Sequence, residues 1–182
     1  MKKPLIPVFA GPTASGKSAL ALQAAREFNG EIVCMDSMQV YRCMDVGTAK
    51  PTWAEREQVP HHMLDVAEPE EAFSVAEYAR GADSAIRDIL SRGRLPVLCG
   101  GTGLYLRALS RPMDFGFVPS DPEVRAKYER FAYEHGKPAL HGLLRECDPK
   151  SADRLHPNDL RRVIRALEVQ ELTGHPFSAQ EM

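Results

Sequence analysis

The sequence predicts an α/β protein, a parallel sheet flanked by helices, with an attached helical subdomain. In the first half of the chain, short apolar runs typical of strands alternate with helical patterns, and a glycine-rich loop follows the first run. After about residue 118, helical patterns follow one another with no strand pattern between them. We therefore expect an α/β core over residues 1–117 and a helical subdomain over residues 118–182.

The composition is that of a globular protein. Of 182 residues, 43% are hydrophobic and 26% are charged, which excludes a disordered or fibrous chain. The formal net charge is −2, so the protein does not bind nucleic acid through its overall charge, although a local basic patch remains compatible with that value.

The sequence also indicates where the protein acts. It has no apolar run near the roughly 18 residues that a membrane span needs, and its first ten residues lack the apolar length of a signal peptide. The cysteines have no CxxC spacing, which favours reduced thiols and a cytoplasmic location. They are Cys34, Cys43, Cys99 and Cys147.

Periodicity and end signals locate the individual elements. Strands are predicted at residues 5–10, 31–35 and 95–99, and helices at residues 17–28, 74–91, 124–135, 138–146, 149–155 and 159–172. Ser74 and Glu77 form a capping-box pattern, and Asp121 followed by Pro122 is a second helix start. Gly136 and Gly174 are predicted to end helices, and residues 178–182 resemble the opening of another helix.

A phosphate-binding loop is the strongest single motif. Residues 11–18, GPTASGKS, match GxxxxGK[ST] between a predicted strand and a predicted helix, as in P-loop NTPases. The glycines let backbone N–H groups surround a phosphate, Lys17 supplies a positive charge, and the Ser18 hydroxyl can bind Mg²⁺. The alternative is a chance glycine turn with a solvated lysine, which the flanking strand and helix disfavour.

Two further loops should meet this one, because the carboxyl ends of parallel strands share one edge of a sheet. Asp36 follows the strand at 31–35, and could be a Mg²⁺ ligand, a general base or a structural cap for the next residues. Thr102 follows the strand at 95–99, and could face a ligand or cap a helix.

Other polar and aromatic residues carry weaker signals. His61 and His62 are adjacent on a predicted strand and face opposite sides, so they cannot share a metal, and we expect them to pack. Arg154, Arg161, Arg162 and Arg165 form a basic run that could contact phosphate or be a solvated face near Glu168. Tyr41, Trp53 and Phe73 could stack on a base, although burial is more common for aromatic residues.

An ordered set of motifs then resembles one family, the bacterial tRNA dimethylallyltransferases (tRNA isopentenyltransferases). These motifs are the phosphate loop, DSMQVYR at 36–42, GTAKP at 47–51, HHMLD at 61–65, GGTGLY at 100–105 and HPND at 156–159. The resemblance covers nearly the whole chain. Because family members continue well past residue 182, it also implies that this sequence lacks the family's C-terminal part.

The resemblance implies transfer of a dimethylallyl group from dimethylallyl diphosphate to N6 of the adenosine on the 3′ side of the tRNA anticodon. Asp36 would be the general base, Thr13 would contact the bridging oxygen, and Lys17 with Ser18 and Mg²⁺ would stabilise the leaving pyrophosphate. The diphosphate-binding residues would be Gly11, Pro12, Thr13, Ala14, Ser15, Gly16, Lys17 and Ser18.

The resemblance also implies that the protein contacts tRNA through a flipped-out base and through the helical subdomain. It further implies a monomer. The implied tRNA-binding residues are Asp36, Ser37, Met38, Gln39, Thr102, Arg125, Arg161, Arg162, Val163, Ile164 and Arg165. Three alternatives stay open: an adenylate dimethylallyltransferase, a P-loop small-molecule kinase, and a non-catalytic RNA-binding protein.

Overall fold

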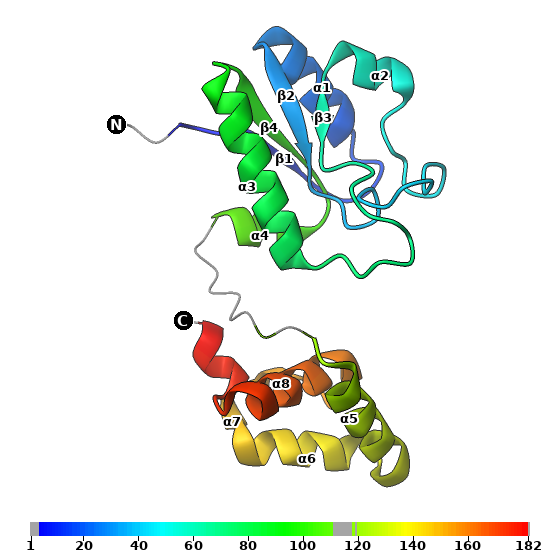
Figure 1. Cartoon of the computed structure of the whole chain (residues 1–182), viewed down its shortest axis with the longest axis vertical. Helices are drawn as coiled ribbons and strands as arrows, with labels where there is room; N and C mark the ends of the chain where they lie inside the picture. The colour runs from blue at the N-terminus through cyan, green and yellow to red at the C-terminus, as the bar shows by residue number, and fades with distance from the viewer. Residues whose placement is uncertain (1–3, 111–117, 119, 182) are drawn as a thin grey trace. The chain divides into compact units, whose positions relative to one another are not determined.

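The computed structural model describes residues 4–110, 118 and 120–181. The chain divides into two compact units, Met1–Pro112 and Met113–Met182, each described here by itself (Figure 1). The boundary expected after residue 117 lies in a stretch outside the described residues.

The first unit contains a four-stranded parallel sheet, as predicted. Its strands are β1 (Val8–Ala10), β2 (Gly30–Cys34), β3 (His61–His62) and β4 (Leu95–Gly100), in the order β1-β4-β2-β3. In register, Cys34 of β2 lies opposite Cys99 of β4. β1 begins three residues later than expected, because Pro7 just before it has no N–H to offer a neighbouring strand, although its carbonyl accepts from Leu98.

Helices cover both faces of this sheet (Figure 1). The α1 helix (Lys17–Glu27) packs on one face, where its Ala21 and Ala25 meet Ile32 and Cys34 of β2. The α3 (Val75–Ser91) and α4 (Gly103–Ser110) helices pack on the other face. Because successive side chains of a strand alternate between faces, Val33 joins the α3 side while Ile32 joins the α1 side.

Capping boxes begin two helices of this unit. At α3, the Ser74 hydroxyl accepts from the Glu77 N–H and the Glu77 carboxylate accepts from the Ser74 N–H, which confirms the predicted start. The short α2 helix (Trp53–Gln58) begins in the same way with Thr52 and Glu55, and was not predicted. The TxxE pattern was its signal, but the helix is too short to show a hydrophobic period.

The second unit is helical. It contains α5 (Pro122–His135), α6 (Lys137–Cys147), α7 (Pro149–Arg154) and α8 (Leu160–Thr173), followed by the 3₁₀ helix η1 (Phe177–Glu181) where the opening of another helix was expected. Gly136 and Gly174 end α5 and α8 with positive φ angles, as predicted. Its own core includes Leu140 and Leu144 of α6 and Val163 of α8.

A buried carboxylate connects β2 with the residues around it. Glu31 is 1% exposed and accepts from Arg92, Arg94 and His62. The Arg92 guanidinium in particular lowers the pKa of Glu31 to about 2, against the opposing effect of burial. His62 is therefore a hydrogen-bond partner of the buried carboxylate, while the Nδ1 atom of His61 lies 2.7 Å from the Val59 carbonyl.

Gly100 is the tightest point of the sheet edge. A Cβ at this position would lie 2.1 Å from the carbonyl oxygen of Met35, which is backbone and cannot move aside. We expect Gly100→Ala to lower the free energy of unfolding by about 3 kcal/mol or more. At Gly103, where a Cβ would meet nothing within 4 Å, the alanine variant should stay within about 0.5 kcal/mol of the parent. Urea unfolding followed by Trp53 fluorescence tests this, and equal midpoints for the two variants would contradict it.

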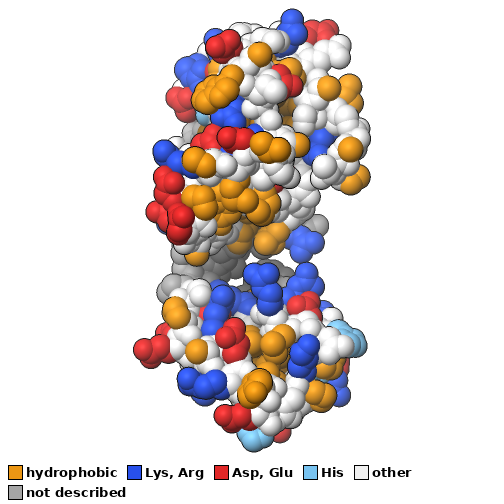
Figure 2. Space-filling model, turned by 90° about the vertical axis from the view of Figure 1, so that its right-hand side faces the viewer, with side chains coloured by type: hydrophobic (Ala, Val, Ile, Leu, Met, Phe, Trp, Pro, Cys, Tyr) orange, Lys and Arg blue, Asp and Glu red, His pale blue; other side chains and the backbone are white. Residues whose placement is uncertain are grey.

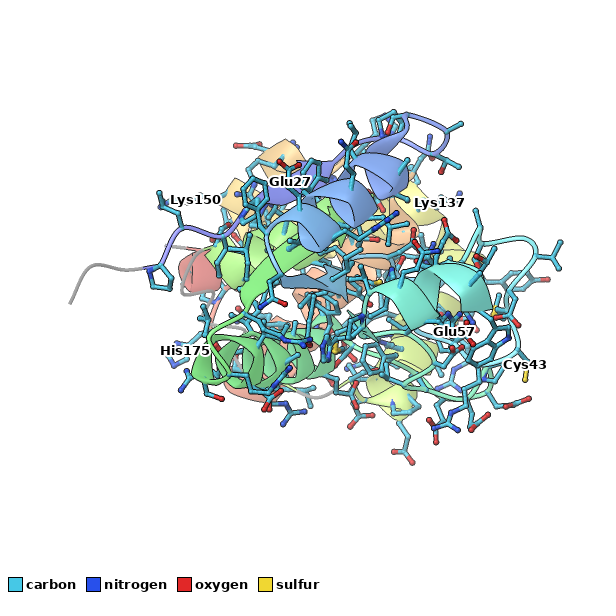
Figure 3. All side chains as sticks on the ribbon, turned by 90° about the horizontal axis from the view of Figure 1, so that it is seen from above. Glu27, Cys43, Glu57, Lys137, Lys150 and His175 are labelled. Carbon is cyan, nitrogen blue, oxygen red and sulfur yellow. The ribbon has the colours of Figure 1, made fainter. Side chains whose placement is uncertain are left out.

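The cysteines are free thiols. Cys34 and Cys99 are buried in the sheet, whereas Cys43 is exposed, and its side chain lies at the periphery (Figure 3). Within the described residues, no helix has the length and apolar character needed to cross a membrane, and no three His, Cys, Asp or Glu side chains gather as a metal site.

Candidate active site

The phosphate loop leads directly into α1. Ala14 and Gly16 both adopt positive φ angles, 64° and 80°, a geometry that turns successive backbone N–H groups toward one concave side. Gly16 precedes the helix without a side-chain cap, so the N–H groups of the first turn are available to an anion. The Lys17 ammonium donates to the Pro12 carbonyl at 3.0 Å, which holds it over its own loop.

Asp36 lies directly after β2 and begins a turn. Its Oδ1 atom accepts from the backbone N–H groups of Met38, at 2.9 Å, and Gln39, at 3.3 Å. The cap considered as one alternative is therefore present. It occupies one carboxylate oxygen, and Oδ2 has no hydrogen-bond partner among the described residues, so capping does not exclude a chemical role.

Thr102 joins the loop after β4 to the loop after β2. Its N–H donates to the Met35 carbonyl at 3.0 Å, and its hydroxyl oxygen accepts from the Ser37 N–H at 3.0 Å. A Cβ on the neighbouring Gly101 would lie 3.3 Å from the Gly11 carbonyl of the phosphate loop. The three predicted loops thus meet at the carboxyl edge of the sheet.

Two further side chains border this edge. Burial raises the pKa of the Cys99 thiol, opposed in part by its hydrogen bond with Ser18 and by the charge of Lys17. Burial, with the nearby Tyr41 and Asp36, raises the pKa of Tyr105 to about 12. The Tyr105 ring stacks on Tyr78 at 3.7 Å between centroids. Both groups stay neutral at physiological pH, so neither adds a charge to this edge.

A buried lysine fixes the long loop that follows Asp36. Lys50 is 8% exposed, and its ammonium donates to the Tyr41 carbonyl, to Asp45 at 2.9 Å and to Asp65 at 2.7 Å. Burial alone would lower the pKa of Lys50, but the hydrogen bonds that its ammonium donates to Asp65 and Asp45 outweigh burial, and the pKa is raised.

Gln39 closes the same loop with its side-chain amide. The Nε2 group donates to the carbonyls of Thr48, at 2.9 Å, and Ala49, at 3.2 Å. The predicted RNA-contacting segment is therefore held from both sides, by the Asp36 cap at its start and by Gln39 at its end.

The predicted arginines of the helical unit differ in their surroundings. The fully buried Glu168 accepts from Arg125 at 2.9 Å and from Arg165 at 2.6 Å. Arg162 pairs loosely with Asp159 at 3.3 Å, while the exposed Arg161 has no ion-pair partner among the described residues. Lys and Arg side chains gather on part of the surface of this unit (Figure 2).

The remaining predicted positions also separate into exposed and buried ones. Thr13, Ser37 and Met38 are exposed. Val163 and Ile164 are 0% and 4% exposed and belong to the core of the helical unit, so their side chains offer no surface to RNA. Val163 and Ile164 therefore anchor α8 in the core, and this packing positions the neighbouring Arg161, Arg162 and Arg165.

Comparison with known proteins decides the family. The family model described as IPP transferase matches residues 39–182, which is well over half of the chain. The chain belongs to the IPP transferase family. This membership supports the resemblance found in the motifs, and it rests on residues that follow the phosphate loop.

Relatives of this IPP transferase family chain are similar over most of its length. It is 54% identical over 178 residues to a tRNA dimethylallyltransferase of Roseiflexus sp. (strain RS-1), covering 97% of this chain and 58% of that protein. It is 51% identical over 173 residues to the tRNA dimethylallyltransferase of Caldanaerobacter subterraneus subsp. tengcongensis, covering 95% of this chain and 55% of that protein. The chain thus spans just over half the length of these curated relatives.

Solved structures of tRNA-modifying transferases are also similar to this chain over nearly its whole length. A tRNA isopentenylpyrophosphate transferase from Bacillus halodurans is similar with a TM-score of 0.62 and 47% identity, covering 96% of this chain and 58% of that one. A eukaryotic dimethylallyltransferase acting on tRNA is similar with a TM-score of 0.78 and 35% identity, covering 96% of this chain and 43% of that one.

Sequence reasoning missed two groups at this site of the IPP transferase family chain. It did not anticipate the Lys50 network, although a loop lysine with Asp45 before it and Asp65 after it was visible in the sequence. It also did not place Cys99 beside Ser18, because that proximity depends on how α1 packs against β4 and not on any local sequence pattern. The roles of the predicted site residues stay predictions.

Proposed function

We propose that the protein transfers a dimethylallyl group from dimethylallyl diphosphate to N6 of the adenosine adjacent to the anticodon, on its 3′ side, in tRNA. The observation that carries this proposal is the meeting of the phosphate loop, Asp36 and Thr102 at one sheet edge, in a chain of the IPP transferase family. The names of the relatives support the same reaction. Since both proposed substrates are cytoplasmic molecules, we propose that the protein acts in the cytoplasm, as a monomer.

The phosphate loop would bind the diphosphate. Its N–H groups, the positive end of α1 and the Lys17 ammonium favour an anion, whatever organic group that anion carries. Thr13 lies in the exposed part of the loop, where its hydroxyl could donate to the oxygen that bridges carbon and phosphorus. As the C–O bond breaks, these donors stabilise the charge that develops on pyrophosphate.

Lys17→Ala should weaken pyrophosphate binding by about 10- to 100-fold, since hydrogen bonds to charged groups contribute about 1.5–3 kcal/mol. Arg26, in the last turn of the same helix, provides the control, because its alanine variant removes a positive charge at the opposite end of α1. Isothermal titration with pyrophosphate measures both. Equal affinities for the parent and the Lys17 variant would exclude Lys17 from anion binding.

Asp36 would accept the proton of the adenine amine. The N6 nitrogen attacks the prenyl carbon, the carbon–oxygen bond to the diphosphate breaks, and the N6 proton passes to Oδ2, the oxygen not used in the cap. The cap fixes the carboxylate plane, so the free oxygen keeps one position relative to Lys17 and Thr102.

The site has the oxygen donors that Mg²⁺ prefers. Mg²⁺ commonly takes only one or two protein ligands and completes its shell with water and substrate phosphates. The Ser18 hydroxyl, at the start of α1, fits that requirement beside the diphosphate, and Mg²⁺ would supply additional charge stabilisation for the leaving group.

Arg161 is the arginine best suited to an RNA phosphate, because it is exposed and does not share the buried Glu168. Arg161→Ala should weaken binding of an anticodon stem-loop and reduce the slope of log K against log salt by about one. The control is Arg130→Ala, an exposed arginine of α5. If the parent and the Arg161 variant share one salt slope, this helix does not contact phosphate.

One assay tests the proposed function against its alternatives. Labelled dimethylallyl diphosphate and Mg²⁺ are offered with an adenosine-containing anticodon stem-loop, with AMP, and with ATP plus small acceptors, using this chain and a form extended to the length of its relatives. Prenyl transfer to RNA supports the proposal. Preferred transfer to AMP would identify an adenylate prenyltransferase, phosphoryl transfer a kinase, and RNA binding without turnover in either form a non-catalytic protein.

A further inference from the structure

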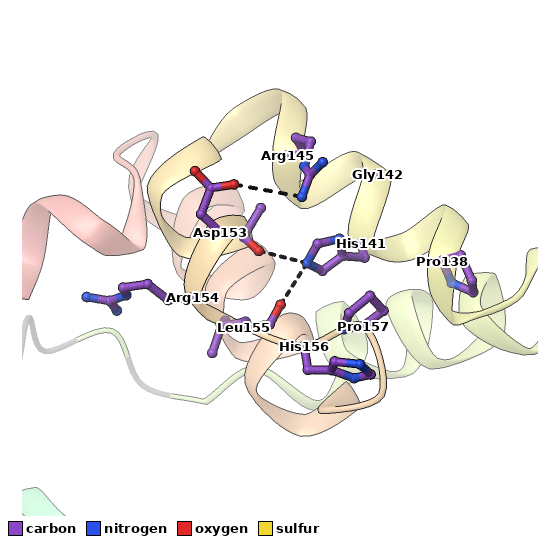
Figure 4. A pocket seen from close by; sticks show the side chains of 10 residues that line it. Pro138, His141, Gly142, Arg145, Asp153, Arg154, Leu155, His156 and Pro157 are labelled. Atoms are coloured by element: carbon purple, nitrogen blue, oxygen red, sulfur yellow. Dashed lines mark hydrogen bonds and ion pairs between the residues drawn. The ribbon is translucent and has the colours of Figure 1, made fainter.

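The helical unit contains a pocket that the proposed prenyl transfer does not use. It has a volume of about 610 Å³ and lies between α6, α7 and the segment that leads into α8 (Figure 4). This volume is within the range of about 300–1,000 Å³ that is usual for small-molecule sites. Arg145, His141 and His156 line it, and Asp153 is the acidic residue among its lining.

Hydrogen bonding fixes which ring atoms of the two histidines can meet a ligand. The Nε2 atom of His141 lies 3.0 Å from the Ala152 carbonyl and 2.8 Å from the Leu155 carbonyl, so it carries the proton and donates to both (Figure 4). His141 is 7% exposed, and its Nδ1 atom has no partner among the described residues. The Nδ1 atom of His141, a residue that lines the pocket, is therefore left as an unused acceptor.

His156 and Arg145 offer donors. The Nδ1 atom of His156 accepts from the Asn158 N–H at 3.1 Å, which leaves the ring proton on Nε2. Among the described residues, the ion-pair contact of Arg145 is a loose one of 3.8 Å with Asp153, and both side chains are mostly exposed, so the guanidinium can exchange this partner for a phosphate. The pocket thus combines two groups that can donate hydrogen bonds to an anion, Arg145 and His156, with one acceptor, His141. Fully ionised inorganic phosphate has no proton to donate to that acceptor.

Gly142 keeps the wall of the pocket open. It lies in the interior of α6, where glycine disfavours a helix relative to alanine, and its φ angle is not positive. A Cβ at this position would meet nothing within 4 Å, so no packing contact requires glycine there. The consequence of the missing side chain is space in the pocket.

We propose that this pocket binds a nucleotide, with its phosphate on Arg145 and His156 and with a ribose hydroxyl or base amine donating to His141. The prolines at 138 and 157, which also line the pocket, provide apolar surface for the sugar or base. The nucleotide is either free or part of an RNA strand. This inference does not depend on the proposed prenyl transfer.

The test uses the whole chain carrying Lys17→Ala, so that the phosphate loop does not compete. AMP, adenosine, inorganic phosphate and a single-stranded RNA hexamer are titrated while the ring nitrogens of His141 and His156 are followed by NMR. We expect AMP or the hexamer to shift both histidines and to bind at least 10-fold more tightly than phosphate or adenosine. A response to the hexamer but not to AMP identifies RNA as the source of the nucleotide.

Substitutions of the residues that line the pocket distinguish a loss of nucleotide binding from a loss of folded structure. Arg145→Ala should weaken binding at least 10-fold and Asp153→Asn should tighten it several-fold. Arg130→Ala, at an exposed residue of α5 that does not line the pocket, should leave binding unchanged. Gly142→Ala should raise Tm while weakening binding, a combination that loss of structure cannot produce. The proposal is overturned if no nucleotide shifts the histidines, if phosphate alone binds as tightly as AMP, or if the Arg145 and Gly142 variants bind like the parent.

Discussion

Asp36→Asn should lower kcat for prenyl transfer by about 10²- to 10⁴-fold while leaving Tm and pyrophosphate affinity close to those of the parent. Asparagine keeps an Oδ1 atom that can accept from the Met38 and Gln39 N–H groups, so the turn after β2 is preserved. What it loses is a basic oxygen at the position of Oδ2. The variant therefore separates the chemical role of the residue from its structural one.

Asp36→Ala provides the comparison, because it removes both the base and the cap. Loss of the cap should cost it about 1 kcal/mol of stability in addition to the loss of turnover. Turnover is measured with labelled dimethylallyl diphosphate and an anticodon stem-loop, and stability by urea unfolding. Parent-like turnover in the asparagine variant would remove Asp36 from the mechanism and leave it as a turn cap.

Glu168→Gln should destabilise the helical unit by about 3 kcal/mol. The fully buried carboxylate accepts from Arg125, Arg165 and the Asp121 N–H, and a neutral amide gives up the charge-assisted part of these bonds. Glu171→Gln is the control on the same helix. Its carboxylate pairs with Lys127 near the surface, so this change should cost less than about 1 kcal/mol.

The two units allow the effect of Glu168 to be located. The single tryptophan, Trp53, lies in the α/β unit, so its fluorescence reports that unit alone. The Glu168 variant should shift the far-UV circular dichroism transition and leave the fluorescence transition in place. A common shift of both signals, or equal stability for the Glu168 and Glu171 variants, would contradict the predicted role.

The pH dependence of this difference follows from the pKa of Glu168. Burial acts to raise the pKa, but the hydrogen bonds from Arg125 and Arg165 outweigh it, and the folded value lies below the ordinary 4.5. A carboxyl whose pKa is lowered by folding stabilises the protein above its unfolded pKa. The difference between parent and Glu168→Gln should therefore be constant above about pH 5. It should then shrink as the pH falls through the folded pKa.

Local patterns predicted the fold where the physical cause is local. The helix starts at Ser74 and Asp121, and the helix ends at Gly136 and Gly174, depend on hydrogen bonds and φ angles within a few residues. The strand order was not predicted, because β4 lies between β1 and β2 through contacts between distant segments. The shortness of β3, two residues, likewise depends on its pairing with β2.

The candidate site could be predicted at the level of loops but not of contacts. Parallel strands made it possible to expect the phosphate loop, Asp36 and Thr102 at one edge. The sequence could not show that Arg165 is bound by Glu168 while Arg161 is not, although both belong to the same basic run and one helix face. That difference depends on which side of α8 packs against α5, a property of the folded unit.

The amide of Gln39 has a consequence for the chemistry of base edges. Since Nε2 donates to the carbonyls of Thr48 and Ala49, the side chain has only its Oε1 atom left for any partner. A nucleobase that meets this oxygen can offer an exocyclic amine or a ring N–H, as adenine and cytosine do with their amines. A carbonyl edge, such as that of guanine O6 or uracil O4, would instead meet a second acceptor and be repelled.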